Sequence, residues 1–138
     1  MMNLFTFEVY TPYRLFFKDS VGVVVLTLTD GEIGIYPGHA PFTAPVCTGI
    51  LNIQDMKGRW RKAFTTEGIL EVTHHKTILL ADAAEWPEEI DYERALRAKE
   101  RAEERIKAKS FRFEVDSAKS KLKRAAFRIQ VYGMRGQQ

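Results

Sequence analysis

The sequence predicts a β-plus-α protein, with an N-terminal antiparallel β-sandwich of about ten short strands and a C-terminal antiparallel hairpin of two helices. Two observations predict it. All five prolines and seven of the nine glycines lie at or before Pro87. Apolar residues alternate with polar ones before this point and recur at spacings of three and four after it. We therefore predict two domains, at 1–86 and 87–138.

Charge divides the chain at the same place. Residues 1–86 carry seven Lys and Arg against nine Asp and Glu, whereas residues 87–138 carry fourteen against nine. The modest overall charge of +3 is therefore the sum of a slightly acidic sandwich and a basic hairpin.

Composition limits the class of protein. With 138 residues, 45% hydrophobic and 28% charged, the chain has the make-up of a globular domain and not of a disordered or collagen-like one. No apolar run approaches the roughly 18 residues that a membrane span needs, so we expect no direct insertion into a membrane. The start of the chain has no features of a targeting leader, and the single Cys47 cannot form an internal disulfide.

Strands are predicted where β-branched and aromatic residues alternate with polar ones or form short runs between turn signals. The glycines and prolines between Asp30 and Pro41 predict a rigid, irregular loop. The predicted strands are 4–10, 21–28, 49–54, 60–66, 69–72 and 77–81.

Two helices are predicted after Pro87. Asp91 is a good N-cap for the first, whose apolar stripe is Ala95, Ala98, Ala102 and Ile106. The pattern breaks over 110–115, and Asp116 or Ser117 is expected to cap a second helix with the stripe Ala118, Leu122, Ala125 and Ile129. Because these stripes are mostly alanine, each residue buries little apolar area and the hairpin is held weakly. A hairpin that can open is plausible on this ground.

Enzyme chemistry is not predicted. The chain has no nucleophile elbow, P-loop, paired-cysteine zinc pattern or dinucleotide fingerprint, so we expect no catalytic residues, no metal and no required cofactor. His74 and His75 are interpreted as an exposed turn, and His39 as a structural histidine. Asp82 and Glu85 are interpreted as structural carboxylates, because nothing near them in sequence supplies a nucleophile.

The last helix has an unusual charge. From residue 117 to 138 there are six basic residues and no acidic one. Arg124 and Arg128 lie at i and i+4, a repulsive pair unless an anion lies between them. A phosphate, an acidic protein segment or nucleic acid could supply that anion. Nucleic acid is the least favoured, because the helix has few neighbouring aromatics and the sandwich is acidic, so we expect no nucleic-acid partner.

Three segments carry a resemblance to a known family. Residues 31–41 read GEIGIYPGHAP, residues 68–72 read GILEV and are followed by LADAAE at 80–85, and residues 90–95 read IDYERA. In these segments, and in the order of sandwich and Ala-rich hairpin, the chain resembles the epsilon subunit of F-type ATP synthases over essentially its whole length.

The resemblance implies a non-catalytic subunit of the rotor's central stalk that couples proton transport to ATP synthesis. Its expected partners are the gamma subunit and the c-ring, and it implies partner contacts at Glu32 and His39 in the first segment. The hairpin would permit ATP hydrolysis when folded on the sandwich and inhibit it when extended, with Lys121 and Lys123 then meeting an acidic segment of a catalytic beta subunit. The implied location is the cytoplasmic face of the bacterial inner membrane, as a peripheral protein.

Some bacterial members of this family hold ATP between sandwich and hairpin, as a regulatory ligand that keeps the hairpin down. The resemblance carries their ligands onto Glu85, Asp91, Arg94, Arg101, Arg124 and Arg128. The alternative for the motif at 90–95 is that Asp91 is only an N-cap and Arg94 pairs with a carboxylate. The alternative for the whole chain is a stand-alone ATP-binding sensor, and a basic nucleic-acid adaptor is a third and weaker one.

Overall fold

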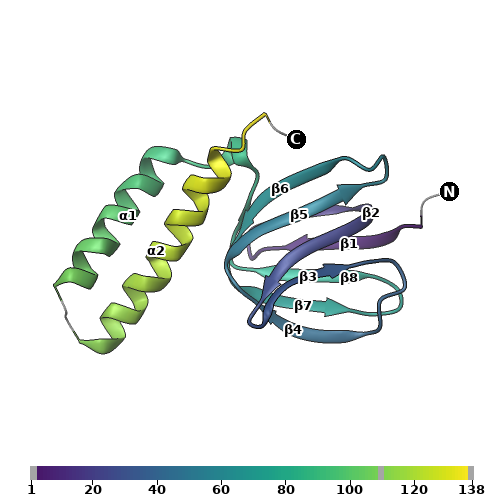
Figure 1. The fold of residues 1–138 in the computed structure, drawn as a ribbon, viewed down its shortest axis with the longest axis horizontal. Coiled ribbons are helices and arrows are strands. Elements are labelled where there is room, and N and C mark those ends of the chain that lie inside the picture. The colour runs from purple at the N-terminus through teal and green to yellow at the C-terminus, as the bar shows by residue number, and fades with distance from the viewer. Residues whose placement is uncertain (1–2, 109–110, 137–138) are drawn as a thin grey trace.

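A computed structural model describes residues 3–108 and 111–136, and it has a β-sandwich with a two-helix hairpin at its side (Figure 1). The predicted fold class is confirmed. The described strands are β1 (Phe5–Tyr10), β2 (Leu15–Leu28), β3 (Gly31–Ile35), β4 (Phe42–Val46), β5 (Gly49–Asp55), β6 (Trp60–Thr65), β7 (Gly68–Val72), β8 (Thr77–Ala81) and β9 (Ala84–Glu85). A 3-10 turn η1 (Pro87–Glu89) leads to the helices α1 (Tyr92–Lys107) and α2 (Arg112–Tyr132).

The strands follow one another in the hydrogen-bonded order β1-β8-β7-β4-β2-β5-β6-β9, and β3 pairs with β2. The long strand β2 joins the two layers, because its first half pairs with β1 and its second half with β3 and β5. The pairings between the described strands are antiparallel except that β1 and β8 run parallel. The short strand β9 pairs with the end of β6 and brings the chain to the edge that faces the hairpin.

The core of the sandwich lies between these layers. Alternating residues of each strand point inward, as β5 illustrates with its fully buried Leu51 and Ile53. Such residues from all nine described strands form one apolar cluster, which includes Phe7, Val24, Ile35, Leu70 and Leu79. The sandwich therefore has its own core, separate from the contacts of the helices.

Two strand predictions needed correction. Strand β2 begins at Leu15, six residues before the predicted start, because its first half, which includes Lys18 and Asp19, pairs with β1. Part of the predicted loop between Asp30 and Pro41 is the strand β3, which pairs with β2. Glycines mark the turns on both sides of β3, since Gly31 and Gly38 have backbone φ angles of 121° and 80°.

The helices pack as an antiparallel pair (Figure 1). Asp91 caps α1 as predicted, with its Oδ1 accepting the backbone N–H of Arg94 at 3.1 Å. Helix α2 begins at Arg112, so the prediction of a cap at Asp116 or Ser117 was wrong. The backbone N–H groups of Glu114 and Val115 donate to the carbonyl of Phe111, which starts the helix a turn earlier. Residues 109–110, inside the predicted break, lie outside the described residues.

Alanines line the seam between the two helices. Ala95 and Ala102 of α1 and Ala118 and Ala125 of α2 are each at most 4% exposed. The stripes predicted from residue spacing therefore face each other. None of the described helices is long and apolar enough to cross a membrane.

Candidate functional site

Helix α2 attaches the hairpin to the sandwich through a small apolar cluster. Val131 of α2 is fully buried against Phe64 of β6 and Ile90 of the linker. Ile50, Phe127 and Tyr132 pack around these three. In Figure 1, α2 lies next to the sandwich and α1 lies on its far side. The hairpin is therefore docked, and α2 carries the contact.

Carboxylates of the sandwich hold Arg124 of α2. Its guanidinium donates to Glu67 and, at 3.2 Å, to Oδ2 of Asp82. Glu67 also accepts a hydrogen bond from the Thr48 hydroxyl. Burial alone would raise the pKa of Glu67, but the hydrogen bonds from Arg124 and Thr48 outweigh it and lower this pKa from 4.5 to about 2. Glu67 is thus a carboxylate whose charge is stabilised by the docked helix.

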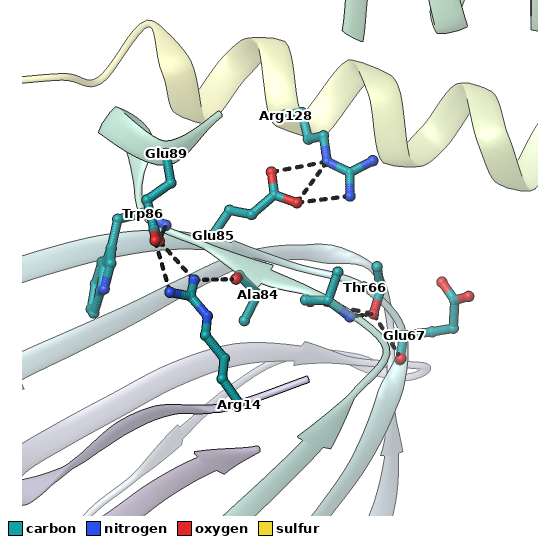
Figure 2. Close-up of polar contacts among 9 residues, drawn as sticks. Arg14, Thr66, Glu67, Ala84, Glu85, Trp86, Glu89 and Arg128 are labelled. Carbon is teal, nitrogen blue, oxygen red and sulfur yellow. Dashed lines mark hydrogen bonds and ion pairs between the residues drawn. The ribbon is translucent and has the colours of Figure 1, made fainter. Parts of the chain in front are cut away.

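Arg128, one turn further along α2, forms an ion pair with Glu85 of β9 (Figure 2). Its Nε lies 3.1 Å from Oε1 and its Nη2 lies 2.9 Å from Oε2, a two-point pairing of guanidinium and carboxylate. The guanidinium carbon also lies 4.5 Å from the ring centroid of Phe64. The anions that the Arg124 and Arg128 spacing predicts are therefore present within the chain, as carboxylates of the sandwich edge.

The linker into the hairpin is fixed to the sandwich. Arg14, in the turn between β1 and β2, donates to both carboxylate oxygens of Glu89 at 2.8 and 2.9 Å and to the carbonyl of Ala84 at 3.2 Å (Figure 2). This hydrogen bond to Arg14 lowers the pKa of Glu89, against the opposing effect of burial. Trp86 stacks on Phe16 with ring centroids 4.6 Å apart. The hairpin is therefore anchored up to Glu89, and any hinge lies beyond it.

A cavity of about 620 Å³ lies where the two helices meet this edge of the sandwich. Four small residues line it and leave room between the helices: Ala95, Ala98, Ala102 and Ala125. All six residues that the resemblance assigns to ATP contribute to its wall: Glu85, Asp91, Arg94, Arg101, Arg124 and Arg128. Three more charged residues complete it: Glu89, Arg105 and Lys121.

The six residues that the resemblance assigns to ATP differ in the contacts they make within the chain. Glu85, Arg124 and Arg128 already form ion pairs between sandwich and hairpin. Asp91 acts as the N-cap, through one of its two carboxylate oxygens. Arg94 and Arg101 make no ion pair with any described residue, so the alternative that Arg94 serves a structural salt bridge finds no support in the described part of the chain.

The residues expected at partner contacts lie apart from one another. Lys121 lines the cavity, whereas Lys123 is exposed outside it. Glu32 is exposed near the start of β3, and His39 lies past the end of that strand with its Nδ1 donating to the Ala40 carbonyl at 2.8 Å. The interpretation of His39 as a structural histidine agrees with this hydrogen bond.

Other histidines gather near His39 without forming a recognisable centre. His74 and His75 lie in the exposed turn between β7 and β8, as expected, and line a small hollow of about 90 Å³ together with His39. Within residues 3–108 and 111–136, no group of three or more His, Cys, Asp or Glu side chains is arranged to hold a metal ion.

Sequence reasoning missed two features of the site. Glu67 was not singled out, although it precedes a predicted strand in the acidic half of the chain and a basic helix needs anions somewhere. Arg105 was not singled out either. It lies four residues after Arg101 on α1, and both line the cavity, whereas Arg97 does not.

Family models match the chain in two adjoining parts. The beta-sandwich domain of the ATP synthase delta/epsilon chain matches residues 4–87, and the long alpha-helix domain of the same chain matches residues 88–133. The chain belongs to the ATP synthase delta/epsilon chain family. The resemblance found from the sequence motifs is thereby confirmed.

Curated relatives in this family extend over nearly the whole chain. The ATP synthase epsilon chain of Caldicellulosiruptor saccharolyticus is 46% identical over 130 residues, 94% of each chain. That of Caldanaerobacter subterraneus subsp. tengcongensis is 43% identical over 132 residues, 95% of each chain.

Solved structures share the fold at low sequence identity. A chain of the Euglena gracilis mitochondrial ATP synthase, in a structure of its OSCP, F1 and c-ring, aligns with a TM-score of 0.72 at 15% identity, covering 96% of this chain and 80% of that one. A chain from the central stalk and c-ring of the Tetrahymena thermophila enzyme aligns with a TM-score of 0.63 at 12% identity, covering 95% and 98%.

Proposed function

We propose that this chain serves as a non-catalytic epsilon subunit in the central stalk of an F-type ATP synthase, where it couples proton transport to ATP synthesis. The observation that carries the proposal is the match to ATP synthase epsilon chains at 46% identity over 94% of the chain. Its partners are then the gamma subunit and the c-ring, with Glu32 and His39 as contact residues. Its location is peripheral, on the cytoplasmic face of the bacterial inner membrane.

The hairpin is the regulatory part in this proposal. Its docking on the sandwich depends on three ion pairs and one small apolar cluster, and its helices meet through alanines. Undocking would release Arg124 and Arg128 from their carboxylates. An extended hairpin would then present a basic α2, with exposed Lys121 and Lys123, to an acidic segment of a catalytic beta subunit and inhibit hydrolysis.

ATP is proposed as the regulatory ligand of the docked state. The cavity suits a nucleotide in size and chemistry, because its arginines can bind phosphates and its carboxylates can accept from amino or hydroxyl donors. A ligand there would touch α1, α2 and β9 at once. Binding only to the docked state stabilises that state by mass action, so ATP would hold the hairpin down.

Association with the central stalk can be tested with the full chain. The tagged chain is mixed with a gamma subunit from a close relative and with an F1 particle stripped of its own epsilon subunit. Stable co-purification with gamma is expected. A chain that does not bind gamma at micromolar concentration, while its circular dichroism shows it folded, would overturn the stalk proposal.

Nucleotide binding can be tested separately by isothermal titration of the full chain with ATP. Arg101→Gln is the informative variant, because Arg101 lines the cavity and has no ion pair with a described residue to lose. Arg97→Gln, on the same helix but outside the cavity, is the matched control. Weaker binding in the first variant alone is expected, and no heat with millimolar ATP would overturn this part of the proposal.

A stand-alone ATP sensor is the second candidate function, and the convergence of the six residues on one cavity favours it. The co-purification and the titration together separate the candidates. A chain that binds ATP but not gamma is a sensor, whereas one that binds gamma has a role in the stalk whatever its affinity for ATP.

A further inference from the structure

All three histidines of the chain meet at one place on the sandwich. His39 comes from the loop between β3 and β4, whereas His74 and His75 come from the turn between β7 and β8. They line a hollow of about 90 Å³, to which Phe5 at the start of β1 also contributes. In Figure 1 this N-terminal end of β1 points away from the hairpin. The histidine hollow is therefore separate from the cavity beside the helices.

No carboxylate lines the histidine hollow among the residues that the structure describes. The other ionisable residues of its lining are Lys76 and Tyr36. Lys76 already pairs with Glu8 of β1 at 3.5 Å, and Glu8 accepts a further hydrogen bond from the Tyr10 hydroxyl at 2.6 Å. Glu71 of β7 is exposed and lies outside the lining. The three imidazoles therefore have no acidic partner within the described chain.

Backbone contacts fix the two loops and leave imidazole nitrogens available. His39 donates from Nδ1 to the Ala40 carbonyl at 2.8 Å, so its Nε2 is left for another molecule. In the other turn, the Thr73 hydroxyl accepts the backbone N–H of His75 at 3.2 Å. The side chains of His74 and His75 are exposed. The hollow is thus a preformed surface site with unused donors and acceptors.

Protonation would change the charge of this hollow more than that of any other group of its size. Histidine ordinarily gains or loses its proton between about pH 5 and pH 8. Neighbouring imidazolium groups repel one another, and a carboxylate placed among them removes this repulsion. Uptake of protons and binding of a carboxylate therefore favour each other. The hollow is far smaller than an ordinary small-molecule pocket and suits a single acidic side chain.

An apolar surface adjoins the hollow on the two strands that the histidine turn connects. Ile69 of β7 and Leu80 of β8 lie opposite each other and are 50% and 49% exposed. Tyr36, in the lining itself, is 58% exposed. Exposed apolar side chains beside a polar hollow are typical of a contact with another protein and not of a site for a free anion.

We propose that the three histidines bind a carboxylate-bearing segment of the gamma subunit and make this contact dependent on pH. The inference rests on the proposed role in the central stalk, in which His39 is a contact residue. It adds His74 and His75 to that contact and gives it a direction, because protonation of the imidazoles tightens the attachment. The adjoining apolar surface indicates a partner with an extended soluble surface, which in the proposed function is gamma.

The test measures binding of the full chain to the gamma subunit of a close relative by isothermal titration at pH 6 and pH 8. A double variant, His74→Gln with His75→Gln, removes two imidazoles from an exposed turn, and circular dichroism checks that it is folded. Lys57→Gln is the matched control, because it removes an exposed base from another turn of the sandwich outside the hollow.

The unmodified chain and the control should bind gamma about tenfold more tightly at pH 6 than at pH 8, the size expected for one charge-assisted contact. The double variant should match the unmodified chain at pH 8 and should gain less than about threefold at pH 6. At pH 7, titrations in two buffers of different ionisation enthalpy should show proton uptake on binding by the unmodified chain, and less by the double variant.

Equal affinity of the unmodified chain at both pH values would overturn the inference, as would the same pH dependence in the double variant. Tighter binding at pH 8 would overturn it in favour of a metal bridge, because imidazoles bind metals in their deprotonated form. Acid-strengthened binding to a detergent-solubilised c-ring instead of gamma would overturn the choice of partner. No binding to gamma at either pH would overturn the proposed stalk role itself.

Discussion

Replacing Glu67 by Gln tests the electrostatic contact that docks α2. Glu67 lies between Thr48 and Arg124, and its pKa is lowered to about 2 by their hydrogen bonds. Glutamine keeps the shape of the side chain and removes its charge. The substitution therefore imitates protonation of Glu67 at any pH.

The pKa shift sets the largest effect that this substitution can have. A change from 4.5 to about 2 corresponds to at most roughly 3 kcal/mol. The Glu67 side chain is 48% exposed, so solvent screens the pair, and Arg124 keeps its second partner Asp82. We therefore expect Glu67→Gln to lower the free energy of unfolding by about 1 kcal/mol at pH 7.

The dependence on pH has a definite sign. Because the folded-state pKa of Glu67 is depressed, its contribution is complete above the unfolded-state pKa of 4.5 and is lost as pH falls toward 2. Urea unfolding, followed by circular dichroism, measures the difference between the unmodified chain and Glu67→Gln. This difference should fall to less than half of its pH 7 value by about pH 3.

The matched control is Glu71→Gln, since Glu71 is an exposed carboxylate of the neighbouring strand β7. It should change the free energy of unfolding by less than about 0.5 kcal/mol at either pH. Equal effects of Glu67→Gln at pH 7 and pH 3, or no effect at pH 7, would refute the reasoning.

Three further predictions concern packing and capping. Gly68→Ala should lower the free energy of unfolding in urea by about 3 kcal/mol, because the added Cβ would lie 1.9 Å from the Leu80 carbonyl oxygen. A loss below about 1 kcal/mol would contradict this close approach. Asp91→Ala should lower the free energy of unfolding by about 1 kcal/mol and Asp91→Asn should hardly change it, because asparagine caps a helix as well as aspartate does. Both variants should weaken ATP binding in calorimetry. Equal losses of stability in the two variants would count against the cap. Val131→Ala should lower the free energy of unfolding by about 2 kcal/mol and speed amide hydrogen exchange in α2, since Val131 is fully buried against Phe64. Unchanged exchange would show that the apolar cluster around Val131 does not dock the helix.

Local patterns were sufficient to predict most elements. Alternating residues and turn signals predicted the strands from Gly49 to Ala81 within about two residues, because each of them has one buried face. The spacing of alanines predicted both faces of the helical seam. Prediction failed at the start of β2, where the exposed Lys18 and Asp19 interrupt the apolar pattern, and at the start of α2, which has no side-chain cap. In both places backbone hydrogen bonds decide the structure: β2 pairs with β1, and the first turn of α2 bonds to the Phe111 carbonyl.

The site was predictable as a set of residues and not as an arrangement. The spacing of Arg124 and Arg128 indicated a need for anions, and the family motifs indicated Glu85 and Asp91. Neither could identify Glu67, which reaches Arg124 across 57 positions of sequence. Such a contact depends on how α2 lies against the edge of the sandwich.

The sequence by itself determined that this protein has an acidic sandwich and a basic, Ala-seamed hairpin, because periodicity, capping and charge are local properties of the chain. Only the tertiary structure decided which charges are matched. It pairs Arg124 and Arg128 with carboxylates of the sandwich and leaves Arg101, Arg105 and Lys121 around a cavity without such partners in the described chain. The physical reason is that an electrostatic interaction depends on distance and solvent exposure, and both are set here by the docking of one domain on the other.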